Sequence, residues 1–234
     1  MQARTHATSR SWELHARRTS NDSAAELHYR RAESIYCRGG GVASAIDFVE
    51  YHYNPTLEAR FLAKHAEYDA RFGAGQHTVL YAFHGTSSEA NLESILRDGL
   101  LLSHLGDGTR SRGHYGCGIY FSETAPVAQL FCAFNERMLV CKLLMGRPCQ
   151  VAKRSGRALE PEFTSHVKDA NGTEIVIYDE ACILPVYTVK RRCLEPNILS
   201  GAPLVTHRDA LMRLGTDGDG ARAPPSKRRR RKEE

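Results

Sequence analysis

A short β-branched and aromatic run at residues 79–83 is followed by a histidine and a glycine, and the ends of strands are common places for the residues of a site. His84 can donate or accept a hydrogen bond through its ring nitrogens, so it suits a hydroxyl or an amide of a ligand. Gly85 has no side chain, so its peptide N–H and C=O can approach that ligand directly. The pair predicts a polar binding site at this strand end.

Two further residues are candidates for the same site. Tyr120 follows a polar, glycine-rich loop at residues 103–118, whose composition lets the backbone come close to a ligand, and Glu174 begins an extended run at residues 174–179. Taken singly, each candidate has an ordinary structural interpretation. A histidine after a strand is more often structural, Tyr120 would be a core aromatic, and Glu174 would be an edge-strand charge that blocks aggregation. Only their combination indicates chemistry.

Four segments of the chain resemble the poly(ADP-ribose) polymerase family in their order and spacing. They are Phe83-His84-Gly85-Thr86, a helix end at Asp98-Gly99-Leu100, Gly116-Cys117-Gly118-Ile119-Tyr120-Phe121-Ser122, and Glu174-Ile175-Val176-Ile177-Tyr178. The resemblance extends from about Asn54 to Arg192, and it makes the ordinary interpretation improbable for the set. It implies an α+β domain with the ADP-ribosyltransferase fold, which has an antiparallel split β-sheet core with flanking helices, and it implies NAD+ as the substrate.

The resemblance also assigns a role to each site residue. The catalytic positions are His84, Tyr120 and Glu174, and the NAD+-binding positions are His84, Gly85, Thr86, Tyr120 and Phe131. In the family the tyrosine packs on the nicotinamide ring, where cation–π attraction contributes about 0.5–2 kcal/mol. The glutamate accepts a hydrogen bond from the ribose 2′-hydroxyl and stabilises the oxocarbenium-like centre that forms as nicotinamide leaves. Members that extend ADP-ribose chains generally carry glutamate here, so we expect poly(ADP-ribose) elongation.

One position departs from the family pattern. Eight residues after the tyrosine the family usually has a serine whose hydroxyl bonds the nicotinamide carboxamide, and ungapped counting reaches Ala128 here. Loss of that hydrogen bond would cost about 0.5–1.5 kcal/mol, which weakens NAD+ binding without abolishing it. A locally shifted alignment is an alternative, because Ser122 and Thr124 lie nearby in the sequence.

Other functions stay open as alternatives. The chain could be a mono-ADP-ribosyltransferase, because some enzymes with all three residues fail to elongate. An RNA 2′-phosphotransferase also uses NAD+ and an H-G-T element, but the later histidine-rich strand of that family is replaced here by residues 118–121. A non-catalytic NAD+- or ADP-ribose-binding module is a third alternative. We expect a protein acceptor, which could be the enzyme itself, and the basic C-terminal run offers a contact for nucleic acid.

The elements that position these residues follow from local patterns. Asn54 and Pro55 predict the start of a helix that Gly73 ends after residue 72. Ser87 or Ser88 can cap a second helix that stops at Gly99. A third helix is predicted at 126–134, and extended runs lie at 119–122, 138–145, 174–179 and 184–191. Because these runs follow one another without regular crossover helices, the pattern favours an α+β domain on antiparallel sheet.

The chain is therefore divided into three parts. Residues 1–44 are predicted to be a disordered or loosely ordered basic segment, allowing a short helix at 24–34. Residues 45–195 form the predicted ADP-ribosyltransferase catalytic domain. Residues 196–234 form a predicted flexible tail that ends in a basic run at 227–232.

Composition limits the class of protein and its setting. The 234 residues, 41% hydrophobic and 25% charged, suffice to bury a core without disulfides. The seven cysteines form no C-x-x-C pair, so we expect a reducing compartment and no metal. No apolar run approaches the roughly 18 residues of a membrane span, so no membrane partner is expected. The net charge of +5 owes much to the C-terminal run, which predicts nuclear localisation, or otherwise a solvated tail on a cytoplasmic protein.

Overall fold

The computed structural model describes residues 9–16, 24–105, 113–132, 137–154 and 157–192, which all belong to one compact unit. The predicted tail at 196–234, with its basic run, lies outside the described residues. So does the centre of the glycine-rich loop, at 106–112.

The larger of two sheets is antiparallel throughout and has the strand order β1-β2-β9-β5-β3. Its strands are β1 (Arg10–Leu14), β2 (Ile46–Tyr53), β9 (Ile183–Arg191), β5 (Arg137–Leu144) and β3 (Val79–Gly85). Most residues of β9 and β5 are buried, because these strands lie inside the sheet. Their near-continuous apolar runs are typical of strands that are covered on both faces.

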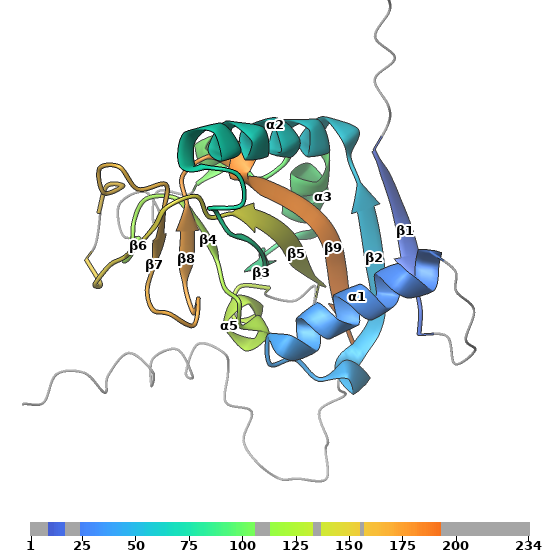
Figure 1. Ribbon diagram of the computed structural model, residues 1–234. Helices are drawn as coiled ribbons and strands as arrows, with labels where there is room; N and C mark the ends of the chain where they lie inside the picture. The colour runs from blue at the N-terminus through green and yellow to red at the C-terminus, as the bar shows by residue number, and fades with distance from the viewer. Residues whose placement is uncertain (1–8, 17–23, 106–112, 133–136, 155–156, 193–234) are drawn as a thin grey trace, which may run out of the picture. The chain divides into compact units, whose positions relative to one another are not determined.

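The smaller sheet has the strand order β4-β8-β7-β6, and each of its strands spans three residues. The strands are β4 (Ile119–Phe121), β8 (Ile175–Ile177), β7 (Ser165–Val167) and β6 (Pro148–Gln150). β6 and β7 run parallel, whereas the other pairs are antiparallel. Figure 1 shows this sheet on the left and the larger sheet on the right. The predicted antiparallel split sheet is confirmed, with one parallel pair as the exception.

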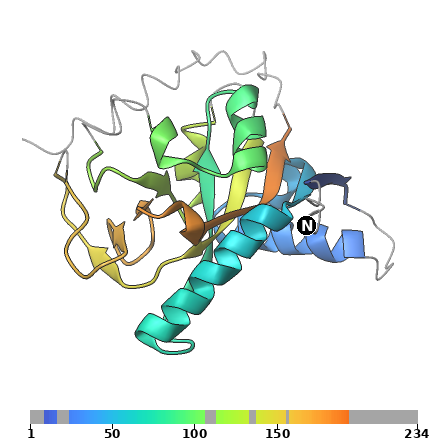
Figure 2. The ribbon, with the colours of Figure 1, turned by 90° about the horizontal axis from the view of Figure 1, so that it is seen from above.

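The helices cover the larger sheet. α1 (Ala24–Arg38) lies on the near side of the sheet in Figure 1 and α3 (Glu89–Asp98) on the far side, and the view from above in Figure 2 agrees. α2 (Pro55–Phe72) runs along the top of Figure 1. The predicted caps of α2 are confirmed, because the Asn54 side chain accepts hydrogen bonds from Thr56 N and Leu57 N, and Gly73 ends the helix at φ 97°. Ser88 caps α3 in the same way.

The N-terminal segment departs from the prediction. α1 is longer than the helix expected at 24–34, and it buries Tyr29, Ala32, Ile35 and Tyr36, which recur at helical spacing, in the main core. β1 pairs along its whole length with β2, a strand that the sequence analysis also missed. The prediction of a disordered or loosely ordered segment is therefore wrong for residues 10–14, and the short helix allowed at 24–34 extends to Arg38. Many residues of these elements are polar. Their apolar residues are buried only by contacts with segments far along the chain, so the sequence did not indicate the burial.

Two other elements are shorter than predicted. The helix expected at 126–134 is α5 (Ala125–Gln129), and residues 133–136 lie outside the described part of the chain. The extended run at 174–179 reduces to β8, followed by the 3-10 helix η3 (Glu180–Cys182). Among the described residues, no helix combines the length and the hydropathy that a membrane span needs.

Candidate functional site

The two sheets meet at a single bridge, and the predicted site residues lie around it. Phe83 N donates to Ser122 O at 2.7 Å, and Ser122 N donates back to Phe83 O at 3.0 Å. The bridge fixes the end of β3 against the end of β4. It therefore brings His84, the next residue of β3, beside Tyr120 of β4.

The hydrogen bonding of His84 defines its protonation state. Its Nδ1 lies 2.8 Å from the carbonyl oxygen of Tyr120, which can only accept, so Nδ1 carries a proton. Burial lowers the pKa of His84, although the bond to Tyr120 opposes this effect. The ring is therefore neutral near pH 7, and Nε2 is left as a hydrogen-bond acceptor. A ligand hydroxyl or amide N–H can donate to it.

The hydroxyl of Tyr120 both donates and accepts a hydrogen bond within the protein. The hydroxyl donates to Gly116 O at 2.8 Å and accepts from Tyr115 N at 3.0 Å. Burial raises the pKa of Tyr120, and the charge of Glu174 raises it further. The phenol therefore stays neutral, and its hydroxyl is already used within the protein. What Tyr120 offers a ligand is the face of a fixed ring.

Glu174 shares a face of the smaller sheet with Tyr120. Tyr120 pairs with Val176, and residues two apart on an extended chain point to the same side, so Glu174 lies on the Tyr120 side. That side packs into a small cluster with Tyr115 and Val176, whereas Ile175 faces the main core. Glu174, the residue before β8, is only partly buried, and its charge acts on Tyr120.

The surroundings of Glu174 act on its charge in opposite directions. Burial raises the pKa of the Glu174 carboxyl, while the nearby Lys168, His114 and Lys153 lower it. Partial loss of water strengthens the interactions of the carboxylate with a cationic centre. The three basic residues favour the ionised form. The sequence analysis did not identify these three residues as part of the site.

A hydrogen-bonded turn fixes the backbone at Glu174. Asp169 Oδ1 accepts from Asn171 N and Thr173 N, both at 3.1 Å, and Lys168 N donates to Glu174 O at 2.9 Å. Gly172 adopts φ +59°, and its carbonyl accepts from Glu123 N at 2.9 Å. The Asp-Ala-Asn-Gly-Thr sequence is typical of such a turn and was readable in advance.

A buried histidine supports Tyr120 from behind, and the sequence analysis missed it. His166 Nε2 accepts from Glu160 N at 3.0 Å, so its Nδ1 carries the proton and donates to Tyr115 O at 2.7 Å. The hydroxyl of Tyr178 lies 2.8 Å from the same Nδ1. This network holds the peptide at Tyr115, whose N–H donates to Tyr120. No local sequence signal marks His166, because its contact with Tyr115 joins positions 51 residues apart.

The glycine at 116 is required by this network. Gly116 has φ +139°, and a Cβ on it would lie 1.6 Å from the hydroxyl oxygen of Tyr178. A side chain at 116 would therefore displace Tyr178.

Packing gives position 85 a structural need for glycine. A Cβ on it would lie 2.2 Å from Ala128 O and 2.9 Å from Phe131 Cβ, so close packing against the end of α5 already excludes a side chain. Thr86 is buried, and Phe131 is 60% exposed and free to meet a ligand. The Ala128 side chain is buried in the main core.

The two residues considered as substitutes for the missing serine have structural positions. Ser122 is buried, and its Oγ accepts a hydrogen bond from Thr124 N at 2.9 Å. Thr124 is the N-cap residue of α5. Ser122 Oγ therefore already accepts one hydrogen bond within the protein, whereas the side chain of Thr124 makes no capping hydrogen bond.

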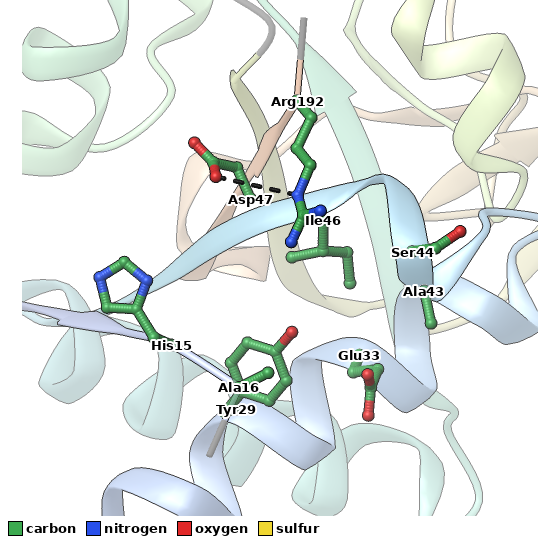
Figure 3. A pocket seen from close by; sticks show the side chains of 9 residues that line it. All are labelled: His15, Ala16, Tyr29, Glu33, Ala43, Ser44, Ile46, Asp47 and Arg192. Atoms are coloured by element: carbon green, nitrogen blue, oxygen red, sulfur yellow. Dashed lines mark ion pairs between the residues drawn. The ribbon is translucent and has the colours of Figure 1, made fainter. Parts of the chain in front are cut away.

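Two hollows of the described surface lie away from the three residues. One, of about 470 Å3, lies between α1 and the end of β9, and its lining includes Asp47 and Arg192, whose side chains are 4.0 Å apart (Figure 3). The other, of about 660 Å3, is lined by residues from the end of α1 and from β3. Neither is lined by His84, Tyr120 or Glu174.

The fold and the site together define a class of protein. Two largely antiparallel sheets that meet at a bridge, with helices flanking the larger one, agree with the ADP-ribosyltransferase fold expected from the sequence. A family model for the poly(ADP-ribose) polymerase catalytic domain matches residues 43–192. This match covers more than half of the chain, so the chain belongs to that family. No curated protein matches the chain. The family match begins after β1 and α1, which nevertheless pack into the same core.

Proposed function

We propose that the chain is an NAD+ ADP-ribosyltransferase that transfers ADP-ribose to a protein acceptor and releases nicotinamide. The observation that supports this function best is the bridge between the sheets. It sets His84 beside Tyr120, and the pairing of β4 with β8 brings Glu174 near enough for its charge to act on Tyr120, which supports a shared site for the three residues. These three groups offer an acceptor, an aromatic face and a negative charge.

Each group has a step to perform in this reaction. Nε2 of His84 accepts a hydrogen bond from a donor group of NAD+, such as a ribose hydroxyl. This bond orients the substrate. The ring of Tyr120 stacks on the cationic nicotinamide, an attraction of about 0.5–2 kcal/mol. The bond between nicotinamide nitrogen and ribose C1′ breaks, and its electron pair leaves with nicotinamide. Glu174 stabilises the positive charge that develops on the ribose.

Transfer completes when the acceptor oxygen or nitrogen bonds to C1′ and gives up its proton. Glu174 can polarise that acceptor, because its pKa is raised by burial and a carboxylate with a raised pKa is a better base. When the acceptor is a hydroxyl of ADP-ribose, the same step extends a chain. We therefore propose poly(ADP-ribose) elongation.

The test incubates the full chain with labelled NAD+ and separates nicotinamide release, a single modified band and a ladder of polymer. We expect a ladder in the wild-type protein. Glu174→Gln keeps the size and hydrogen-bonding capacity of the side chain but removes its charge, so nicotinamide release should fall about 10²–10³-fold. NAD+ binding, measured by calorimetry, should change only a few-fold.

Glu162→Gln serves as the matched control, because the side chain of Glu162 is 83% exposed and its ion pair with Arg147 is long, at 3.9 Å. A single band in the wild type would instead support mono-ADP-ribosylation. Binding of NAD+ without release of nicotinamide would contradict the proposed enzyme and favour a binding module. Unchanged turnover in Glu174→Gln would refute the role of Glu174.

A further inference from the structure

Three side chains with metal-binding atoms meet at the C-terminal end of α2, outside the site described above. His65 and Asp69 are one helical turn apart, and the turn through Gly73 and Gly75 returns the chain so that His77 faces them. One ligand atom of each residue lies within 4.8 Å of the others. Asp69 Oδ2 is 3.1 Å from His65 Nδ1, and Asp69 Oδ1 is 3.7 Å from His77 Nδ1. The sequence analysis expected no metal and did not connect these residues.

The state of His77 is the second observation. The His77 side chain is 1% exposed, and neither of its ring nitrogens has a hydrogen-bond partner. The other buried histidines of the described residues, His52 and His166, have both ring nitrogens bonded. Buried polar groups without partners are rare and costly, and a bound cation is one of the few physical explanations for one. His77 points into the cluster, so a bound cation would satisfy it.

We propose that His65, Asp69 and His77 bind a divalent transition-metal ion, with Zn2+ as the best fit. Two imidazoles and one carboxylate are ligands that zinc accepts, whereas Mg2+ and Ca2+ prefer oxygen ligands throughout. The side chains of His65 and Asp69 are 37% and 33% exposed, so the outer position of a tetrahedral site faces water. The ion is therefore coordinated by three protein ligands and a water molecule.

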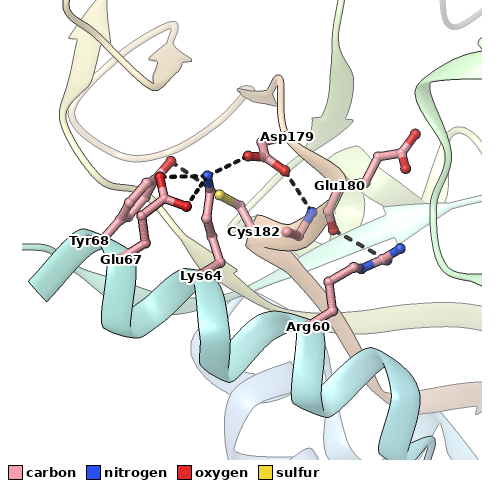
Figure 4. A network of polar contacts seen from close by, with 8 residues as sticks. Arg60, Lys64, Glu67, Tyr68, Asp179, Glu180 and Cys182 are labelled. Carbon is pink, nitrogen blue, oxygen red and sulfur yellow. Dashed lines mark hydrogen bonds and ion pairs between the residues drawn. The ribbon is translucent and has the colours of Figure 1, made fainter. Parts of the chain in front are cut away.

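The neighbouring contacts suit this ion. Asp69 Oδ1 accepts a hydrogen bond from Gly75 N at 3.2 Å, which orients the carboxylate as ligand-supporting contacts do. The nearby positive charge of Lys64 is offset by ion pairs with Glu67 at 2.9 Å and Asp179 at 2.8 Å, as Figure 4 shows. The cation at this position therefore meets little net repulsion.

The site would join the end of α2 to the start of β3. His77 lies two residues before β3, whose other end carries His84, roughly 20 Å away along an extended strand. Tyr68 contacts the His77 ring with its own ring and Cys182 Sγ with its hydroxyl, at 3.2 Å. The metal therefore stabilises the packing of α2 on η3 and takes no part in the reaction of NAD+.

The test begins with the full chain freed of metal by a chelator and of any affinity tag. Titration with Zn2+ alone should show one ion per chain, and addition of 100 times the dissociation constant should raise the melting temperature by about 5–10 °C. Visible absorption of the Co2+-substituted protein should report tetrahedral coordination. These readouts do not depend on turnover, so they are separable from the proposed enzymatic function.

Two variants and a control keep the proposal falsifiable. Asp69→Asn retains an oxygen that accepts from Gly75 N but loses the charge, and Zn2+ affinity should fall about 10–100-fold. His77→Phe fills the same buried space and should abolish the zinc-dependent rise in melting temperature. His15→Gln, at a histidine whose side chain is 61% exposed, should leave Zn2+ binding unchanged. Absence of stoichiometric Zn2+ uptake, or uptake equal in all three variants, would overturn the proposal.

Discussion

The larger and the smaller sheet hold the chain together by different means. The larger sheet has strands of five to nine residues whose apolar side chains fill the main core. Backbone hydrogen bonds between its strands hold these side chains in place. The smaller sheet has strands of three residues, buries Ile119, Phe121, Ile175 and Ile177 in the same core, and relies in addition on hydrogen bonds made by the side chains of His166, Tyr178 and Tyr120. The proposed site takes His84 from the larger sheet, Tyr120 from the smaller sheet, and Glu174 from the residue before β8. Changes in the larger sheet should therefore affect stability first, and changes in the smaller sheet should affect activity first.

The largest expected effect on stability comes from His52 in the larger sheet. Its ring nitrogens lie 2.7 Å from Ser11 Oγ and 2.6 Å from Thr188 Oγ1, so it links β1, β2 and β9. Burial, helped by the charge of Arg137, lowers the pKa of His52 from 6.5 to about 4. Below pH 6.5 His52 binds a proton in the unfolded chain, whereas in the folded chain it stays neutral down to about pH 4. Stability should therefore fall by about 3 kcal/mol between pH 6.5 and pH 4, where the folded state also becomes protonated.

Denaturant unfolding at several pH values between 7.5 and 4 measures this fall. His52→Asn should flatten the profile by about the same amount, and nicotinamide release at pH 7.5 should stay close to that of the wild type. The His15→Gln variant, at an exposed position, should keep the wild-type slope. A wild-type profile that is flat over this range would show that the sheet does not exclude the proton.

The second largest expected effect comes from Gly116, which lies beside the hydrogen-bond network of the smaller sheet. Gly116→Ala would place a methyl group 1.6 Å from the present position of the Tyr178 hydroxyl oxygen, at a φ of +139° that disfavours alanine. Backbone strain and the displaced tyrosine together should cost about 1–3 kcal/mol. Because Gly116 O also accepts from Tyr120, nicotinamide release should fall about tenfold or more.

Gly75→Ala is the matched control for backbone strain, since Gly75 has φ +69° but a Cβ there meets no atom within 4 Å. We expect Gly75→Ala to reduce the melting temperature modestly and to leave turnover intact. If both glycine variants lost stability and activity in the same proportion, the contrast between the sheets would be wrong.

The smallest effect concerns Ala128. The sequence analysis expected that the missing serine hydroxyl weakens NAD+ binding, but the Ala128 side chain is buried in the main core. Ala128→Ser should therefore lower stability by about 1 kcal/mol and leave NAD+ affinity unchanged, because the added hydroxyl enters apolar surroundings. Calorimetric NAD+ titration checks this result. A tenfold gain in affinity would show instead that position 128 faces the ligand.

Local signals predicted the elements that carry their own boundaries. Asn54 with Pro55 and Ser88 with Gly99 mark the ends of α2 and α3, because capping depends on residues within one turn. β3 and β5 follow from β-branched and apolar runs. β1 was missed and α1 was expected only as a short helix at 24–34, because their apolar residues gain a core only from strands that lie far along the chain.

The sequence identified the candidate site through its resemblance to the poly(ADP-ribose) polymerase family, because three of the four matching motifs carry His84, Tyr120 and Glu174. Only the tertiary structure decided their chemical state. A carbonyl 2.8 Å away sets the tautomer of His84, and burial beside three basic groups sets the balance of charge at Glu174. Likewise, three unremarkable residues of the sequence, His65, Asp69 and His77, became a candidate metal site once the turn after α2 brought them together. Spacing along a chain fixes which groups are present, whereas burial and distance fix what those groups can do.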